Sequence, residues 1–288
     1  MDLNGVGHVD ILSGSYSRQT KDMAGLFQVL WGSAAGFKKP AVLNGTDGEP
    51  LIIKADKSQV VEFICTRPFA IDWNGDQKLD LVVGNFGGSF YVFTGEGKGK
   101  FAPGGELLKT ATGSKLKVSH HSDPFCIDWD GDGDVDILSG SASGGVYFAE
   151  NVAKKGAAPK LSQFRSVIPA GKRPKGPFVN DSEFVGPTTD TRIWVDDVNG
   201  DGKLDILVGD SVTLVSPAKG MTEKQALAKQ LKWDAKSKQI QNAMQKFGAD
   251  TSAEERNRVS REYSAHYRAR SEFLNEQRTG FVWLYARK

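Results

Sequence analysis

At 288 residues the chain is long enough for one large domain or two small ones, and its formal net charge of +2 creates no global field that would favour nucleic acid or an anionic membrane. No run of residues approaches the ~20 apolar positions that a membrane-spanning helix needs. The 33 glycines are typical of many tight turns between short strands. Composition therefore favours a turn-rich protein and argues against nucleic-acid partners and membrane spans.

A nine-residue acidic segment occurs four times in the chain, and we call its copies the acidic loops. They begin at residues 2, 72, 128 and 197, so the intervals between them are 70, 56 and 69 residues. Each has oxygen-bearing side chains at positions 1, 3 and 9 and glycine at position 4, and the last three copies also have aspartate at position 5. Repetition at such intervals predicts a repeat fold.

Four strand signals recur in the same order around each acidic loop. The first precedes the loop (68–71, 124–127, 192–195), and the second follows it and ends in glycine (11–14, 81–84, 137–140, 206–209). A third, aromatic strand (25–31, 89–93, 145–149, 280–285) and a weaker fourth (37–43, 101–108, 164–168) complete the unit. This order predicts an all-β fold: a β-propeller of four-stranded antiparallel blades, with about four blades present and the first truncated.

Residues 217–278 interrupt the last unit with a helical composition. Thr222 with Gln225, and Ser252 with Glu255, predict two capping boxes. Apolar residues at helical spacing predict two apolar stripes: Leu227, Leu231, Ile240, Met244 and Phe247, and then Val259, Tyr263, Tyr267 and Leu274. We therefore predict a helical hairpin inserted in the last blade of a single domain that covers residues 1–288. Its arginine-rich run is interpreted as a solvated face, with docking of a partner as the alternative.

The acidic loops have the side chains of a hard-cation site. Two carboxylates ~4 Å apart repel by roughly 4 kcal/mol at an effective dielectric of ~20, so a cluster of them favours a bound cation. Oxygen ligands favour Ca²⁺, or less well Mg²⁺, over zinc or copper. The alternative is that Asn-Gly and Asp-Gly only form turns. With position 7 contributing its main-chain carbonyl, the predicted ligands are Asp72, Asn74, Asp76, Lys78 and Asp80; Asp128, Asp130, Asp132, Asp134 and Asp136; Asp197, Asn199, Asp201, Lys203 and Asp205; and, as a weak fourth set, Asp2, Asn4, His8 and Asp10.

These loops and the strands that follow them resemble the FG-GAP/VCBS repeat family, whose calcium-loop propellers are related to the head of integrin α chains. The shared signature is Asp-x-(Asp/Asn)-Gly-Asp-x-x-x-Asp followed by (Ile/Leu)-(Leu/Val)-x-Gly, and it is clearest at 72–84, 128–140 and 197–209. The resemblance implies a β-propeller with structural Ca²⁺, at about three sites, in the hairpin between the first two strands of each blade. The chain also resembles secreted bacterial VCBS-repeat proteins, which usually have more repeats, so ring closure is left open.

The ends of the first strands that lie away from the acidic loops form the candidate ligand-binding face. The repeat alignment places Arg67, Asp123 and Arg192 at equivalent positions there, and His121 lies just before Asp123. Charged side chains that converge around a propeller axis could hold a glycan, a peptide or a small anion. Ser122, His121 and Asp123 superficially suggest a catalytic triad, but neighbours in one loop rarely adopt that geometry.

Three functions are compatible with these features. The favoured one is a calcium-stabilised module that binds a glycan or protein ligand, and no catalytic residue is assigned. The second is a polysaccharide lyase or hydrolase that acts at the face opposite the calcium. The third is a scaffold whose helical hairpin recruits a protein.

Two features of the chain bear on its cellular location and redox chemistry. The first acidic loop begins at Asp2 without the strand that precedes the others, so we expect a longer, exported protein whose leader lies upstream. The expected location is extracellular or periplasmic. Cys126 occupies a position that is alanine in the equivalent strand, so we predict a buried thiol rather than a disulfide with Cys65.

Overall fold

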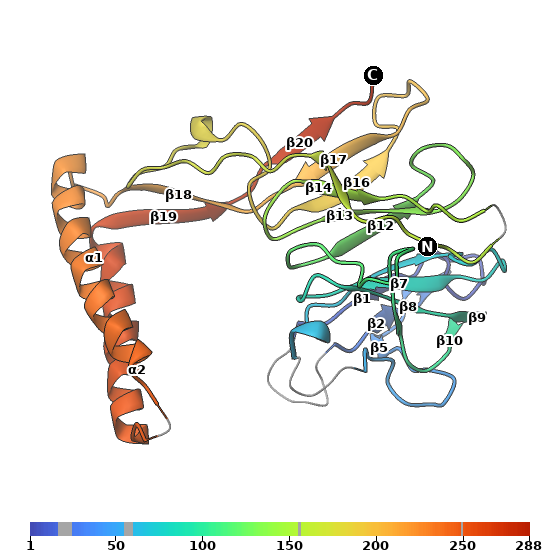
Figure 1. Ribbon diagram of the computed structural model, residues 1–288, viewed down its shortest axis with the longest axis horizontal. Helices are drawn as coiled ribbons and strands as arrows, with labels where there is room; N and C mark the ends of the chain where they lie inside the picture. The colour runs from blue at the N-terminus through green and yellow to red at the C-terminus, as the bar shows by residue number, and fades with distance from the viewer. Residues whose placement is uncertain (17–24, 55–59, 155–156, 249) are drawn as a thin grey trace. The chain divides into compact units, whose positions relative to one another are not determined.

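The computed structural model describes residues 1–16, 25–54, 60–154, 157–248 and 250–288. The chain divides into two compact units. The first comprises Met1–Gly171, Gly186–Asp210 and Phe281–Lys288, and the second comprises Lys172–Val185 and Ser211–Gly280. The described residues form mainly antiparallel sheets with two α-helices (Figure 1), so the prediction of a mostly β protein is confirmed.

Four sheets of similar construction follow one another along the first unit. The first sheet contains β1 (Ile11–Ser13), β2 (Gln28–Leu30) and β5 (Ala41–Val42), and the second contains β6 (Arg67–Ile71), β7 (Asp80–Gly84), β8 (Phe90–Phe93) and β11 (Glu106–Leu107). The third sheet contains β12 (Asp123–Ile127), β13 (Asp136–Gly140), β14 (Val146–Ala149) and β15 (Arg165–Ile168). The fourth sheet contains β16 (Arg192–Asp196), β17 (Asp205–Gly209) and β20 (Val282–Tyr285). The minor elements of this unit are the strand pairs β3 (Gly32–Ser33) with β4 (Gly36–Phe37) and β9 (Gly95–Gly97) with β10 (Lys100–Phe101), and the 3₁₀ turn η1 (Val60–Glu62).

Strand alternation explains how these sheets pack in series. Successive side chains of a strand point to opposite faces. In β7, Leu81 therefore packs with Val29 of the first sheet, whereas its neighbour Val82 packs with Ile137 of the third. Leu138 of β13 in turn packs against the fourth sheet. Each inner sheet is buried on both faces, which explains why all five residues of β7 and of β13 are buried.

A close backbone contact joins each sheet to the next. At Gly140, the last residue of β13, an added Cβ atom would lie 2.1 Å from the carbonyl oxygen of Thr191, which immediately precedes β16. The following residue, Ser141, donates its backbone N–H to Thr191 Oγ1 at 2.8 Å, and Thr191 donates its own N–H to the Ser141 carbonyl at 3.0 Å. Only glycine permits this approach, because any Cβ atom would overlap the carbonyl.

The same junction occurs between the other neighbouring sheets. The residue after the glycine donates its backbone N–H to a hydroxyl that precedes the next sheet; the pairs are Ser15 with Thr66 at 3.0 Å and Asn85 with Ser122 at 2.7 Å. Gly209, at the equivalent position of the fourth sheet, meets nothing closer than a carbonyl oxygen of its own sheet at 4.0 Å. In the first three sheets, the glycine at the end of the second strand is thus the point where the following sheet packs closely.

The second unit contains two helices and a two-stranded ribbon. Its elements are β18 (Val212–Pro217), the 3₁₀ turns η2 (Asp181–Glu183) and η3 (Ala269–Glu272), α1 (Glu223–Gln245), α2 (Ala253–Arg268) and β19 (Leu274–Thr279). The capping box of Thr222 and Gln225 is confirmed at the start of α1, and Ser252 accepts the N–H of Glu255 at the start of α2. The ribbon of β18 and β19 was not predicted.

The buried seam between the two helices differs from the predicted apolar stripes. Leu227, Leu231 and Met244 of the first predicted stripe are exposed, whereas Ile240 of that stripe and Val259 of the second are buried. The seam is held instead by Trp233, whose indole stacks on His266 with 4.5 Å between ring centroids and donates a hydrogen bond to the His266 carbonyl at 2.8 Å. An aromatic pair with a polar group can replace a stripe of leucines, because it combines large contact area with a satisfied donor.

Two smaller expectations can also be compared with the structure. Cys126 is buried and both cysteines are free thiols, as predicted. Across the part of the chain that the structure describes, none of the helices has both the length and the apolar character to cross a membrane.

Candidate functional site

The acidic loops fold in the same way because their first aspartate closes the turn. In the loop 72–80, the Asp72 carboxylate accepts the backbone N–H groups of Gly75, Asp76 and Gln77 at 2.8, 3.0 and 2.9 Å. The Asn74 side chain accepts the N–H of Asp76 as well, at 2.9 Å. Asp197 and Asp2 make the equivalent three bonds in their own loops, and Asp128 makes two of them. Position 1 therefore determines the conformation of the loop.

The aspartate at position 9 ties the loop to the sheet. Asp136 is completely buried and accepts the N–H of Trp129, at loop position 2, at 3.0 Å and that of Asn151, which follows the third strand, at 2.8 Å. Asp80 does the same with Trp73 and Gly95. Asp10 makes the same two bonds, so in the first three sheets one carboxylate connects the loop with the second and third strands, whereas among the described residues Asp205 accepts only the N–H of Arg287, at 3.0 Å.

The oxygen atoms of the third loop converge. Carboxylate oxygens of Asp128, Asp130 and Asp136 lie within 4.8 Å of one another. At that separation two full charges repel by about 3 kcal/mol at an effective dielectric of ~20. The buried oxygen Oδ1 of Asp134 has no hydrogen-bond partner, and neither has Oδ2 of Asp205 in the next loop. Converging carboxylate oxygens, with a buried and unpaired carboxylate oxygen of Asp134 in the same loop, fit a calcium ion and suit neither zinc nor copper.

The pKa values of these carboxyl groups are displaced in the direction expected of crowded acids. Burial raises the pKa of Asp136 to about 6, and the nearby charges of Asp130 and Asp134 add to the effect. Burial also raises the pKa of Asp80, to which the charges of Asp76 and Asp72 contribute. The pKa of Asp134 is raised by desolvation first and then by its acidic neighbours. A bound cation would relieve this cost.

The loops differ in their fitness for a cation. The loop 72–80 has a lysine at position 7, and Lys78 Nζ lies 3.2 Å from Asp76 Oδ2, so its own ammonium group neutralises part of the charge. The first loop has Val6 at position 5, yet it keeps the hydrogen bonds that fold the others. The loop 128–136 has five carboxylates and is the strongest candidate.

A second cluster lies at the other ends of the first strands, as the sequence predicted. Arg67, Asp123 and Arg192 are the first residues of β6, β12 and β16. The Asp123 carboxylate lies between the two guanidinium groups, 3.6 Å from Arg67 Nε and 3.8 Å from Arg192 Nε. The structure therefore brings together three charged residues from three successive sheets.

His121 joins this cluster through a partner that sequence reasoning did not identify. Its Nδ1 lies 2.8 Å from Asp190 Oδ1, and the Phe86 ring packs edge-on against the imidazole with 4.6 Å between centroids. Cys65, His121 and Asp190 occupy equivalent positions in the three repeats, two residues before the charged residue, and all have left-handed φ values of 59, 54 and 49°. Left-handed non-glycine residues tend to gather at functional sites, because the strain must be maintained by the surrounding structure.

Electrostatics within the cluster follow burial. Burial raises the pKa of Asp123, although the charges of Arg192 and Arg67 pull it down. Desolvation and the neighbouring charge of Arg192 lower the pKa of Arg67. Desolvation also lowers the pKa of His121, against the raising effect of Asp190. A neutral imidazole with a carboxylate on Nδ1 leaves Nε2 to accept a hydrogen bond.

The triad suggested by adjacent residues does not form. The Ser122 hydroxyl is buried and donates to the Ser89 carbonyl at 2.7 Å, with the Asn85 carbonyl also near, at 3.2 Å, as part of a junction between sheets. His121 faces Asp190 rather than Ser122. Ser122 therefore serves the packing of the sheets and is not a nucleophile.

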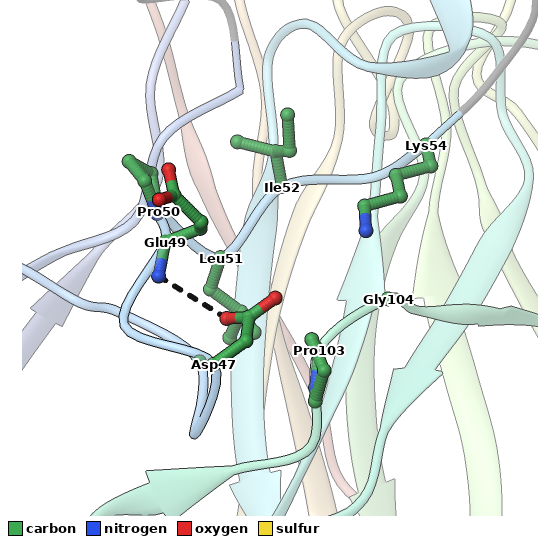
Figure 2. Close-up of a pocket in the computed structure, with 9 residues that line it drawn as sticks. Asp47, Glu49, Pro50, Leu51, Ile52, Lys54, Pro103 and Gly104 are labelled. Atoms are coloured by element: carbon green, nitrogen blue, oxygen red, sulfur yellow. Dashed lines mark hydrogen bonds between the residues drawn. The ribbon is translucent and has the colours of Figure 1, made fainter.

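A hollow elsewhere in the first unit was not anticipated from the sequence. It has a volume of about 350 Å³ and is lined by Gly45, Asp47, Glu49, Pro50, Leu51, Ile52, Lys54, Pro103 and Gly104 (Figure 2). The Asp47 carboxylate accepts the N–H of Glu49 at 3.1 Å and so closes the turn that forms one wall. None of the predicted site residues lines this hollow. The Asp47 carboxylate in its wall is already used to close the turn.

The comparisons with known proteins agree with the loop geometry. The family model of the FG-GAP-like repeat matches residues 72–139, from the first aspartate of one acidic loop to the penultimate residue of β13. No curated protein matches the chain. The matched segment contains two acidic loops and the strands between them. The resemblance stated from the sequence is therefore confirmed over this part of the molecule, where residues 72–139 match the FG-GAP-like repeat.

Proposed function

We propose that the chain is a calcium-stabilised β-propeller module that binds a glycan or protein ligand at the face opposite its acidic loops. The observation that carries the proposal is the convergence of Arg67, Asp123 and Arg192 from three successive sheets, at the strand ends away from the loops. The acidic loops lie at one end of each sheet and would have a structural role. The charged residues, which differ from sheet to sheet, lie at the other end and would recognise the ligand.

The propeller part of this proposal is supported by the serial packing of the sheets. Each sheet packs face to face on the next, and the same glycine–hydroxyl junction joins each neighbouring pair. Blades of a propeller have four antiparallel strands in series, as in the second and third sheets. That all 288 residues form one domain, and that it functions outside the cell or in the periplasm, are parts of the same proposal.

Calcium is proposed as the structural ion of the three complete loops. Asp128, Asp130, Asp132 and Asp136 would hold it in the best site, with the main-chain carbonyl of residue 134. The equivalents in the loops 72–80 and 197–205 would hold two further ions. Extracellular calcium modules of this kind bind with dissociation constants on the order of 10⁻⁴–10⁻³ M. The ion would neutralise the carboxylates and stiffen the turn; it takes no part in chemistry.

The calcium proposal is tested by titrating the chelator-treated protein with CaCl₂ in a calorimeter and by thermal melting. We expect saturable heat, and a stabilisation of about 2.7 kcal/mol per site when free calcium is 100 times the dissociation constant. Asp130→Asn should abolish the strongest site. Asp47→Asn makes the same change in charge outside the loops and should leave the titration unaltered. A melting temperature that is indifferent to EDTA would refute the proposal.

The recognition face would bind a ligand with acidic and hydroxyl groups. Arg192 is the more accessible of the two arginines, with 40% of its side chain exposed against 18% for Arg67, so it would make the first contact. Guanidinium groups form paired hydrogen bonds with carboxylates, and Asp123 would accept hydroxyl hydrogens. Uronic-acid-containing glycans and acidic peptides share this chemistry.

Binding is tested on an array of acidic and neutral glycans, and with acidic peptides, using the wild type, Arg192→Ala and Asp123→Ala. Arg165→Ala removes an exposed arginine from β15 and is the matched control. We expect the acidic ligands to be retained by the wild type and the control and lost from Arg192→Ala. Equal binding by Arg192→Ala would contradict the assignment of this face. Turnover of a bound glycan would instead favour the lyase or hydrolase alternative.

A further inference from the structure

One side of helix α1 in the second unit is the feature from which we draw a further inference. Figure 1 shows α1 beside α2, and the side of α1 that is covered contains Ala226, which packs with Leu274 of the ribbon, and Trp233, which stacks on His266 of α2. With 3.6 residues per turn, a second set of positions lies on the opposite side. All members of this set are exposed, and we call them the outer face: Lys224, Leu227, Ala228, Leu231, Ala235, Lys238 and Asn242.

The spacing of the outer face is that of a helix that packs against another helix. Positions 224, 228, 231, 235, 238 and 242 are separated alternately by four and three residues, which is the 3.5-residue repeat of paired helices. At the centre of this row, Leu231 is 62% exposed and lies between Ala228 and Ala235. A leucine between two alanines leaves room for large side chains of a second helix, because the distance between packed helices depends on the side chains at the contact.

The two ends of this row are positively charged. Lys224 and Lys238 are separated by about 21 Å along the helix axis. Within the described part of the chain, neither ammonium group has a hydrogen bond or an ion pair. α1 contains five lysines and two acidic residues, and one of these acids, Asp234, accepts a hydrogen bond from Gln230 at 3.0 Å. The charge left on the outer face is therefore positive, and a complementary surface would be acidic.

The same lysines argue against a second copy of the chain as the occupant. Leu231 lies midway between Lys224 and Lys238, so antiparallel pairing of two outer faces would place Lys224 of each copy against Lys238 of the other. Parallel pairing would place each lysine against its own equivalent. Like charges opposite one another oppose association. A lipid surface is also poorly matched, because interfacial helices need a broad apolar face and Leu227 and Leu231 are the only large apolar side chains here.

From these observations we propose that the outer face of α1 binds an acidic amphipathic helix of a protein partner. Large apolar side chains of that helix would pack against Ala228, Leu231 and Ala235, and its carboxylates would lie opposite Lys224 and Lys238. Recognition of an amphipathic helix through anchors at helical spacing is a recurrent mode of protein association. The inference concerns the second unit alone, and it depends neither on calcium nor on the ligand proposed for the cluster around Asp123.

The test uses the full chain and, as the probe, a fluorophore-labelled synthetic peptide of three heptads. The peptide has leucine at the first and fourth positions of each heptad, glutamate at the flanking fifth and seventh positions, and alanine and glutamine elsewhere. Repulsion between its own glutamates opposes pairing of the peptide with itself. Saturable anisotropy is expected below about 1 mM, and added salt should weaken the binding because exposed charges contribute to it.

Variants of the outer face separate the apolar contact from the charges. Leu231→Gln should weaken binding about tenfold, because it removes the central apolar contact. The double variant Lys224→Glu with Lys238→Glu should also bind about tenfold more weakly, and a peptide with lysine in place of glutamate should restore its binding. A variant that had merely lost its fold could not be rescued in this way. Lys229→Glu with Arg261→Glu makes the same change in charge at exposed residues outside the outer face and is the matched control.

The contrary outcomes are equally specific. Absence of saturable binding up to about 1 mM overturns the proposal, and so does binding that is unaffected by Leu231→Gln or is lost equally from the matched control. Arg192→Ala should bind the peptide like the wild type, and loss of binding from it would place the peptide on the cluster around Asp123 instead. Sedimentation of the wild type as a dimer that Leu231→Gln dissociates would show that a second copy covers this face. Binding to phosphatidylglycerol vesicles that Leu231→Gln abolishes, without binding of the peptide, would show that a lipid surface does.

Discussion

Asp136 and Asp130 belong to the same acidic loop, but their contacts in the structure differ. Substitution of each with asparagine therefore distinguishes the contribution of a carboxylate to the fold from its contribution to cation binding. Asp130 is an exposed side chain at loop position 3, and it accepts one long bond, at 3.3 Å, from the N–H of Asp132. Asp136 is buried and accepts two backbone N–H groups. In EDTA we expect Asp136→Asn to destabilise the protein and Asp130→Asn to leave it within about 0.5 kcal/mol of the wild type.

The size of the Asp136→Asn effect follows from its contacts. The amide can accept from only one of the two N–H groups, so one charge-assisted bond worth about 1.5–3 kcal/mol is lost and a buried N–H is left unpaired at a further cost of about 1–3 kcal/mol. The raised pKa of Asp136 shows that its charge is itself unfavourable by about 3 kcal/mol before solvent screening, or about 1–2 kcal/mol after it. The net loss is about 3 kcal/mol, within a range of about 0.5–5 kcal/mol.

Thermal melting in EDTA and in calcium provides the assay. The expected loss lowers the melting temperature of a unit of this size by roughly 5–10 °C for Asp136→Asn in EDTA. Asp130→Asn should melt like the wild type in EDTA and should lack part of the wild type's gain in calcium. Equal melting temperatures for the two variants in EDTA would show that position 9 has no structural task apart from the ion, and the reasoning would fail.

Three further predictions concern the sheets and their junctions. Gly140→Ala should cost about 2–4 kcal/mol of stability, because the new Cβ would lie 2.1 Å from the Thr191 carbonyl oxygen and would break the two hydrogen bonds between Ser141 and Thr191. Gly209→Ala, which has open space around it, should be nearly neutral. Chemical denaturation of both variants checks this. Thr191→Val keeps the shape but leaves the Ser141 N–H unpaired, and it should cost about 1–3 kcal/mol in the same assay, with Thr213→Val on exposed β18 as control. Burial raises the pKa of Glu62, but the hydrogen bonds from Ser89 and Lys115 outweigh burial and leave that pKa below 4.5. The stability that this carboxylate contributes is therefore present above about pH 4.5 and is lost on acidification. Glu62→Gln should show a shallower acid-denaturation slope than the wild type, and an equal slope would contradict the prediction.

Local patterns predicted the strands and loops of the first unit well. The alternation of apolar residues and the glycine that ends each second strand are short-range signals, so β7, β13 and β17 begin and end within a residue of the predicted limits. The acidic loops are equally local, because position 1 bonds to residues three to five positions later. Such contacts can be predicted from spacing alone.

Long-range partners were harder to predict. β19 has mostly exposed, polar residues, and it pairs with β18 across both helices, so no apolar period identifies the ribbon. Asp190 bonds to His121 from 69 positions away and lies in no recognised motif. The repeat alignment does contain the relevant signal, because it places Asp190, His121 and Cys65 at equivalent positions. Comparing all three repeats there would have identified the missing partner.

Differences among the repeats help to separate structural residues from recognition residues. Positions 1 and 9 of the acidic loops are aspartate in all four copies: position 1 folds every loop, and position 9 ties the loop to its sheet in the first three. The first residues of β6, β12 and β16 are arginine, aspartate and arginine, and the left-handed residues before them are cysteine, histidine and aspartate. A fold made of equivalent sheets does not require different charges at these equivalent positions. Different charges would be useful for binding a ligand that is not itself symmetric, because an asymmetric set of charges can bind such a ligand in a single orientation. Under the proposed function, the acidic loops would support the fold and the cluster around Asp123 would provide the specificity for a ligand.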